Sequence, residues 1–129
     1  MLFLIITHAK HFVDSDGSIY AYSPYVTEMN IWLKYVDKVT IVAPKADEID
    51  TNIDSKYKHS NIHFIEVKAF SLTSVKNSLK AIFSVPAVKW KVYKAMKVAD
   101  HIHLRCPGNM GLIGCFAQIF FPKKTKTAK

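Results

Sequence analysis

The sequence predicts an α/β fold in which helices cover both faces of a parallel sheet, and three observations support this. Residues 2–6 (LFLII) are consecutive and apolar, which is typical of a parallel strand that is buried on both faces. Ser23 and Pro24 then mark a helix start, because serine is a common N-cap and proline suits the first helical turn. Strand-like and helix-like segments continue to the end of the chain in an order that βαβ units produce.

Length and composition indicate one domain. The chain has 129 residues, of which 50% are hydrophobic, and this is enough for a core. The net charge of +8 predicts attraction to phosphate, anionic lipid or nucleic acid, with a lysine-rich solvated surface as the alternative. Cys106 and Cys115 form neither a zinc-type pair nor a disulfide framework, which favours a reducing, cytoplasmic setting. The start does not resemble a signal peptide, and the apolar residues 111–121 are too few for a bilayer span, which takes about 20.

The first half of the chain predicts a helix and two further strands. After Ser23, apolar residues recur at helical spacing over roughly three to four turns. These residues are Val26, Met29, Trp32, Leu33 and Val36. Residues 38–43 (KVTIVA) predict the second strand, and residues 61–67 (NIHFIEV) alternate as expected of a third strand at an edge. Between them, residues 45–60 predict a long acidic loop, of a kind that is usually functional or mobile.

The second half predicts helices around one more strand. Residues 71–98 contain six lysines and no acidic residue, so they predict basic helices. Ser74 can cap the first of these helices, and Pro86 is expected to end it and to start a second one. Residues 100–106 (DHIHLRC) predict the fourth strand, and Asn109 is expected to cap a closing helix that runs to about residue 121.

Together these elements predict a Rossmann-like, three-layer parallel sheet with the strand order 3-2-1-4, because crossovers between parallel strands are right-handed. A further strand should pair beside the fourth, and residues 125–129 are expected to be its first residues. We therefore interpret residues 1–129 as a single domain of a larger protein, truncated before its last strand or strands.

Candidate binding residues gather at the carboxyl edge of this sheet, where ligands bind in open α/β folds. The loop after the first strand contributes His8, and Arg105 ends the fourth strand just before a helix N-terminus. A helix N-terminus and a guanidinium both favour anions, so we expect Arg105 to hold a phosphate or a carboxylate. The alternative is that Arg105 pairs with a carboxylate of a loop.

Histidines add a second kind of chemistry at the same edge. His8, His11 and His103 could meet there as metal ligands, as a base, or as hydrogen-bond donors to a sugar. No spacing among them imposes a zinc site, so no metal is expected. Asp16 and Gly17 are typical of a tight turn. The absence of G-x-G-x-x-G and P-loop motifs argues against a dinucleotide or ATP site.

The segment at residues 100–107, D-H-I-H-L-R-C-P, resembles the D-x-x-H-x-H-x-P stretch on the fourth strand of glycosyltransferase family 4, the retaining enzymes of GT-B architecture. The first strand and helix, the TIVAP of the second strand and the FIEV of the third resemble the same N-terminal domain. By position, His103 matches the first histidine of the motif and Pro107 matches its proline. Arg105 stands where the family has its second histidine, and Gly17 alone represents the glycine-rich turn after the first strand.

This resemblance implies the acceptor-binding domain of a retaining glycosyltransferase of hexosyltransferase type. Such an enzyme moves a sugar from a nucleotide-sugar donor to a glycan or lipid-linked acceptor. The donor would bind a missing C-terminal domain with an E-x7-E pair, so this chain alone is expected to need no cofactor and to be inactive. The residues assigned to acceptor or phosphate binding are His8, Gly17, Tyr22, Ser23, Arg105 and Asn109. His103 is the one candidate for a catalytic role.

The resemblance also implies a location. Many such enzymes use lipid-linked acceptors, so we expect a cytoplasmic protein at the inner face of a membrane. The lysines expected to meet anionic headgroups are Lys76, Lys80, Lys89, Lys91, Lys94 and Lys97. An ordinary lysine-coated helix is the alternative explanation of the same residues.

Two other classes of protein fit parts of the sequence. One is a stand-alone basic module that binds anionic surfaces or nucleic acid, although few aromatic residues lie among the lysines. The other is a small flavodoxin-like regulator, which would need an acidic cluster after the first strand, where THAK stands instead. With the glycosyltransferase interpretation, no nucleic-acid partner is expected.

Overall fold

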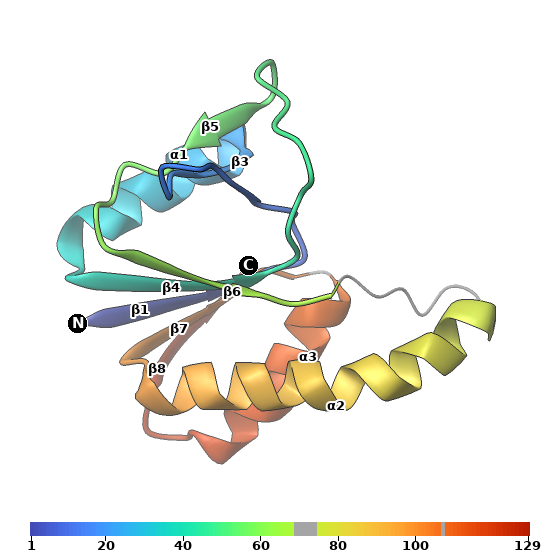
Figure 1. Cartoon of the computed structure of the whole chain (residues 1–129). Coiled ribbons are helices and arrows are strands. Elements are labelled where there is room, and N and C mark those ends of the chain that lie inside the picture. The colour runs from blue at the N-terminus through green and yellow to red at the C-terminus, as the bar shows by residue number, and fades with distance from the viewer. Residues whose placement is uncertain (69–74, 107) are drawn as a thin grey trace.

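The main sheet is parallel throughout and has the predicted order. The computed structural model describes residues 1–68, 75–106 and 108–129, with residues 75–84 described by their backbone alone. Five strands follow one another as β6-β4-β1-β7-β8 (Figure 1). They are β1 (Leu2–Ile6), β4 (Lys38–Ala43), β6 (Ile62–Glu66), β7 (His101–Leu104) and β8 (Thr125–Ala128). The order 3-2-1-4 is confirmed, and β8 is the strand that we expected beside the fourth.

Strand β1 lies at the centre of the sheet. It pairs with β4 on one side and with β7 on the other, so that Ile5 lies between Ile41 and His103. Its side chains alternate between the two faces, and Leu4, Ile5 and Ile6 are all fully buried. Burying each of these side chains contributes about 1.5–3 kcal/mol, which makes β1 the best anchored element of the fold.

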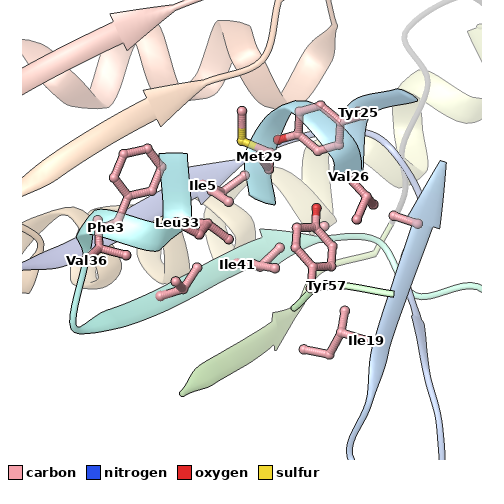
Figure 2. Close-up of a cluster of buried hydrophobic side chains, with 13 residues drawn as sticks. Phe3, Ile5, Ile19, Tyr25, Val26, Met29, Leu33, Val36, Ile41 and Tyr57 are labelled. Carbon is pink, nitrogen blue, oxygen red and sulfur yellow. The ribbon is translucent and has the colours of Figure 1, made fainter. Parts of the chain in front are cut away.

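Helices cover the two faces of the sheet separately. On one face lie α1 (Ser23–Trp32) and the 3₁₀ turn η1 (Leu33–Tyr35), and on the other lie α2 (Val75–Val98), α3 (Asn109–Ala117) and η2 (Gln118–Phe120) (Figure 1). Each face therefore has its own hydrophobic cluster. Figure 2 shows the cluster on the α1 side, where Phe3 and Ile5 of β1 meet Met29 and Leu33. Leu4 and Ile6 point into the other cluster with α2 and α3.

A second, three-stranded sheet is present where the sequence predicted only loops. Strands β2 (Phe12–Val13), β3 (Ile19–Tyr22) and β5 (Asp54–Lys56) pair antiparallel in the order β2-β3-β5. The prediction of loops over residues 45–60 and after the first strand was therefore wrong in part. The small sheet forms because its short strands bury Ile19 and Ala21, together with Tyr57, against α1. The predicted turn at Asp16 and Gly17 closes its hairpin, with Gly17 at φ 82°.

Two residues that we predicted as helix N-caps, Ser23 and Asn109, are instead the first residues of their helices. Ser23 is the first residue of α1 and Tyr22 is the N-cap, because the Ser23 hydroxyl hydrogen-bonds the hydroxyl of Ser55 on β5 at 2.6 Å instead. Pro24 does lie in the first turn, as predicted. Asn109 is the first residue of α3, which is capped by Gly108. The prediction for Ser74 falls outside the described residues.

Pro86 lies inside a single helix and does not end it. The sequence predicted two helices here, whereas α2 continues through Pro86 as one helix. Proline removes one backbone donor from the helix, a cost that the burial of Val88, Val92 and Met96 against the sheet offsets. In the described parts of the chain, no helix is at once long enough and apolar enough to span a bilayer.

The burial of β1 gives a test of the fold. We expect Leu4→Ala to lower the free energy of unfolding by about 2–5 kcal/mol, since Leu4 is fully buried between the sheet and α2. Leu112→Ala, the same change at a leucine that is 52% exposed, should alter it by less than about 0.5 kcal/mol. Urea unfolding measures both values, and similar losses for the two variants would contradict this packing.

Candidate functional site

A cavity of about 270 Å³ opens at the carboxyl end of β7. It brings together the start of α1, the end of β7 and the residue that follows β8. Its lining residues are Tyr22, Pro24, Tyr25, Glu28, His103, Arg105, Cys106 and Lys129. Ligands of parallel α/β sheets bind at this edge, so this cavity is the candidate site.

Close packing of α3 holds the end of β7 in place. A Cβ atom at Gly111 would lie 2.8 Å from the Arg105 carbonyl oxygen, and one at Gly114 would lie 2.5 Å from Leu104 Cδ2. At Gly111 the close atom belongs to the backbone, so a larger residue there would force the strand end and the helix apart, whereas at Gly114 the Leu104 side chain would have to shift. The Arg105 N–H also donates to the Ile6 carbonyl at 2.9 Å, which continues the β1–β7 ladder to the cavity.

Arg105 is held by an aromatic ring instead of a carboxylate. Its Cζ atom lies 4.0 Å from the ring centroid of Tyr25, which is a favourable cation–π geometry. Among the described residues the ion pairs are Met1–Asp37 and Glu28–Lys129, so Arg105 has no acidic partner there. Its Nη1 atom is buried and makes no hydrogen bond. The alternative in which Arg105 pairs with a loop carboxylate is therefore wrong.

Two more side chains of the cavity have buried polar atoms that lack a partner, namely Tyr25 Oη and His103 Nδ1. Burial raises the pKa of Tyr25, so its hydroxyl keeps its proton and remains a donor. Burial also lowers the pKa of His103, and the neighbouring His101 lowers it further. A neutral imidazole offers one donor and one acceptor nitrogen. The cavity thus joins a fixed cation with two neutral hydrogen-bonding groups.

His103 is positioned by stacking. It projects from β7 toward α1, where its ring stacks on Phe3 with the centroids 6.0 Å apart and meets Trp32 at the same distance. Only 1% of its surface is exposed. His101 lies two residues earlier on the same side of β7. It hydrogen-bonds Thr125 and Thr127 of β8, so its side chain links these two strands.

An ion pair borders the cavity. Glu28 of α1 pairs with Lys129, which follows β8, so the pair joins two elements far apart in the sequence. The Lys129 N–H donates to the Leu104 carbonyl at 3.0 Å, which attaches this residue to the end of β7. An anion in the cavity would compete with Glu28 for Lys129.

The loop after β1 and the segment after β7, which we expected to meet at this edge of the sheet, are in contact. A Cβ atom at Gly108, after β7, would lie 2.6 Å from His8 Nδ1 in the loop after β1, so the two residues are in contact. Gly108 also has φ 155°, a conformation that favours glycine. Asn109 follows directly as the first residue of α3. Of the other predicted residues, Tyr22 lines the cavity.

Four of the six predicted binding residues do not line the cavity: His8 and Asn109 are not among its lining residues, and Ser23 and Gly17 lie elsewhere. Ser23 is turned toward Ser55 and is not among the residues that line the cavity. Gly17 lies at the tip of the β2–β3 hairpin, where it borders a different, open hollow of about 790 Å³ with Tyr57 and His59. These residues are separated from the cavity because the first loop folds into the small sheet, which the sequence did not predict.

His11 is part of the core. Its Nδ1 donates to the Ala9 carbonyl at 2.8 Å, and its Nε2 accepts from the Tyr57 hydroxyl at 2.9 Å. The ring is fully buried, and burial lowers its pKa to about 4. Both nitrogens are therefore occupied, and His11 does not join His8 and His103. Within the described residues, no three His, Cys, Asp or Glu side chains are placed to hold a metal ion.

The sequence did not point to three residues of the cavity, which are Tyr25, Glu28 and Lys129. Tyr25 and Glu28 are three residues apart within α1, a spacing that places them on one side of the helix. That spacing is a signal that the sequence contains. Lys129 has no comparable signal, because its place depends on the pairing of β8 with β7.

The burial of His11 gives a pH test. The unfolded chain binds a proton at His11 near pH 6.5, whereas the folded chain binds it only near pH 4, so stability falls as the pH drops. Between about pH 7 and about pH 5 the loss from this residue is about 2 kcal/mol. His101 and His103, whose pKa values are also lowered, add to the fall in the same direction. Urea unfolding at the two pH values measures it.

The control is His11→Gln, which removes the titrating group and leaves His101 and His103 in place. The variant should lose that part of the pH dependence whatever its stability at pH 7. An unchanged pH dependence in His11→Gln would show that the buried ring is not responsible.

Comparisons of the chain with protein-family models, with curated proteins and with solved structures found no match. The structure itself establishes an α/β fold whose five-stranded parallel sheet is flanked by helices. The function of the cavity must therefore be argued from its own chemistry.

Proposed function

We propose that the cavity binds a phosphorylated or acidic sugar, and that the chain is the acceptor-binding part of a retaining glycosyltransferase. The observation that carries this proposal is the group of three buried polar atoms without partners, Tyr25 Oη, His103 Nδ1 and Arg105 Nη1. A buried polar group without a hydrogen bond costs about 1–3 kcal/mol, more for a charged group. Tyr25, His103 and Arg105 all line one cavity, so a ligand bound there is the proposed source of the missing partners.

The chemistry of the three groups selects the ligand class. The Arg105 guanidinium can form a bidentate pair with a phosphate or a carboxylate. The Tyr25 hydroxyl can donate to a further oxygen, and the neutral His103 ring can bond a sugar hydroxyl. A nonpolar ligand would leave all three unsatisfied. A hexose with a phosphate or carboxylate matches the mixture of one cation and two neutral groups.

The assignment to sugar transfer rests on the resemblance of residues 100–107 to the family motif, in which His103 occupies the position of the first histidine. In this role His103 is the catalytic candidate and orients an acceptor hydroxyl from the rim of the sheet. Arg105 replaces the second histidine and favours an anionic acceptor. The nucleotide-sugar donor would be supplied by a second domain, so the chain alone should not turn over such a donor.

Ligand binding tests the proposal directly. Titration of the labelled chain with a hexose phosphate should shift the amide signals around Tyr25, His103 and Arg105. Arg105→Gln should weaken this binding about tenfold or more, since hydrogen bonds to a charged group contribute about 1.5–3 kcal/mol. Arg105→Lys should recover part of the loss, because it restores the charge without the planar fork.

The control is Lys34→Gln, which removes an exposed cation from η1 that is not among the residues lining the cavity. It should leave binding unchanged. Inorganic phosphate and an unphosphorylated hexose separate the two halves of the ligand, and each should bind more weakly than the hexose phosphate. Shifts confined to other surfaces, or turnover of a nucleotide sugar by the chain alone, would contradict the proposal.

A further inference from the structure

The side chains of the two cysteines, Cys106 after β7 and Cys115 in α3, are directed at the same place. A Cβ atom at Gly111 of α3 would lie 2.9 Å from Cys106 Sγ, so that sulfur rests on the side of α3 where Gly111 leaves room for it. Cys115 follows Gly111 by four residues, a spacing that puts it on the same side of the helix. Side chains of a helix lean toward its N-terminus, so the Cys115 thiol lies over the turn that contains Gly111.

Both cysteines are free thiols that are partly buried against the cluster on the α2–α3 face. Burial raises the pKa of the Cys115 thiol, and Cys106 raises it further through its charge and through a hydrogen bond between the two side chains. Cys115 therefore keeps its proton at neutral pH. Cys106 also lines the cavity at the end of β7, so a reagent in solution can reach it. This places Cys106 first in any reaction of the pair.

We propose that Cys106 and Cys115 form a reversible disulfide, which makes the end of β7 a redox-sensitive modification site. The oxidant is a small disulfide such as glutathione disulfide. The Cys106 thiolate attacks one sulfur of the oxidant, which releases one glutathione and leaves the other attached to Cys106. Cys115 then loses its proton, attacks the Cys106 sulfur and releases the second glutathione. Two protein thiols and one glutathione disulfide thus become one protein disulfide and two glutathione thiols.

The fold does not need this bond. The disulfide would close a loop of ten residues, from Cys106 to Cys115, most of which α3 already orders. A disulfide stabilises a fold mainly by constraining the unfolded chain, and short loops gain least from it. The bond can therefore open and close while the chain stays folded, as is typical of disulfides that sense redox conditions.

Oxidation would act on the wall of the cavity. Cys106 directly follows Arg105, and its N–H donates to the carbonyl of Lys129, another residue that lines the cavity. A bond to Cys115 attaches the Cys106 side chain to α3, so the oxidised and reduced chains differ next to Arg105. The modification site consists of the two thiols alone and does not depend on the ligand proposed for the cavity.

Lysines near α3 favour an anionic oxidant. Glutathione disulfide is negatively charged at neutral pH, whereas the net charge of the chain is +8. Lys89 of α2 borders a hollow that α3 also lines, and Lys94 lies over an aromatic ring of its own helix. Lys91 instead donates to a backbone carbonyl at the end of β6 at 2.7 Å. The side chains of Lys76 and Lys80 fall outside the described part of the chain.

Mass spectrometry of the whole chain in a glutathione redox buffer tests the proposal. After the free thiols are alkylated, trypsin releases residues 106–123 as one peptide, because no lysine or arginine lies between Cys106 and Lys123. We expect this peptide to be lighter by two hydrogen atoms and to contain neither glutathione nor an alkyl group. Dithiothreitol should restore both thiols. The amide signals of Arg105 and Gly111 should shift when the bond closes, and unchanged signals would contradict the effect on the cavity wall.

Two variants separate the disulfide from other outcomes. Cys115→Ser should retain glutathione on Cys106, because no second thiol can displace it. Cys115→Ser with Phe116→Cys keeps two thiols at nearly the same spacing but turns one of them about 100° around the helix, to a position where Phe116 is 62% exposed. In the folded chain its equilibrium constant for closure should be at least about tenfold lower than that of the original pair.

Unfolding provides the reference for this comparison. In concentrated urea the original pair and the Phe116→Cys pair should close alike, since their loops differ by one residue. The proposal is overturned if the folded chain stays reduced in a buffer that oxidises the unfolded chain, or if it retains glutathione on Cys106. Disulfides that join two chains, or equal closure of the two pairs in the folded state, would overturn it as well.

Discussion

The fold depends on the central strand β1, which is hydrogen-bonded along both edges and buried on both faces. A strand in this position can contain almost no polar side chains, and LFLII contains none. Because its neighbours β4 and β7 run parallel to it, the segments that follow all three strands emerge at the same edge. The meeting of His8 with Gly108, and of Arg105 with α1, follows from this arrangement.

At that edge the protein maintains an arrangement that costs stability. Tyr25, His103 and Arg105 each bury a polar atom without a partner, although an apolar residue could fill each position more favourably. The surrounding contacts are close: His103 is stacked on Phe3, and α3 approaches Arg105 through Gly111. Costly groups that are held rigidly in this way are typical of binding sites, where a ligand supplies the missing hydrogen bonds.

The helix layers on the two faces of the sheet differ in the charge of their exposed residues. The first half of the chain, which supplies α1 and the small antiparallel sheet, contains nine of the ten acidic residues. On the other face, α2 contains six lysines and no acidic residue, and α3 and η2 expose Phe116 and Phe120. The division is possible because each face has its own hydrophobic cluster, so the exposed side of one helix layer does not constrain the other.

Much of this protein was determined by local sequence. Consecutive apolar residues, strand alternation and the right-handed crossover rule were enough for the α/β class, the strand order and the position of β8. They were also enough to place His8 and Arg105 at one rim. These features depend on short-range patterns and on a general rule of chain handedness, which a single sequence contains.

The tertiary structure alone decided the rest. Strands β2, β3 and β5 are two to four residues long, too short to show a periodicity, and they form only because α1 buries their side chains. The same contacts turned Ser23 toward Ser55 and carried Gly17 away from the cavity. Packing against the sheet kept α2 continuous through Pro86. In each case the free energy gained by burying side chains is larger than the local preference of a single capping, loop or proline residue, so packing decided the local structure.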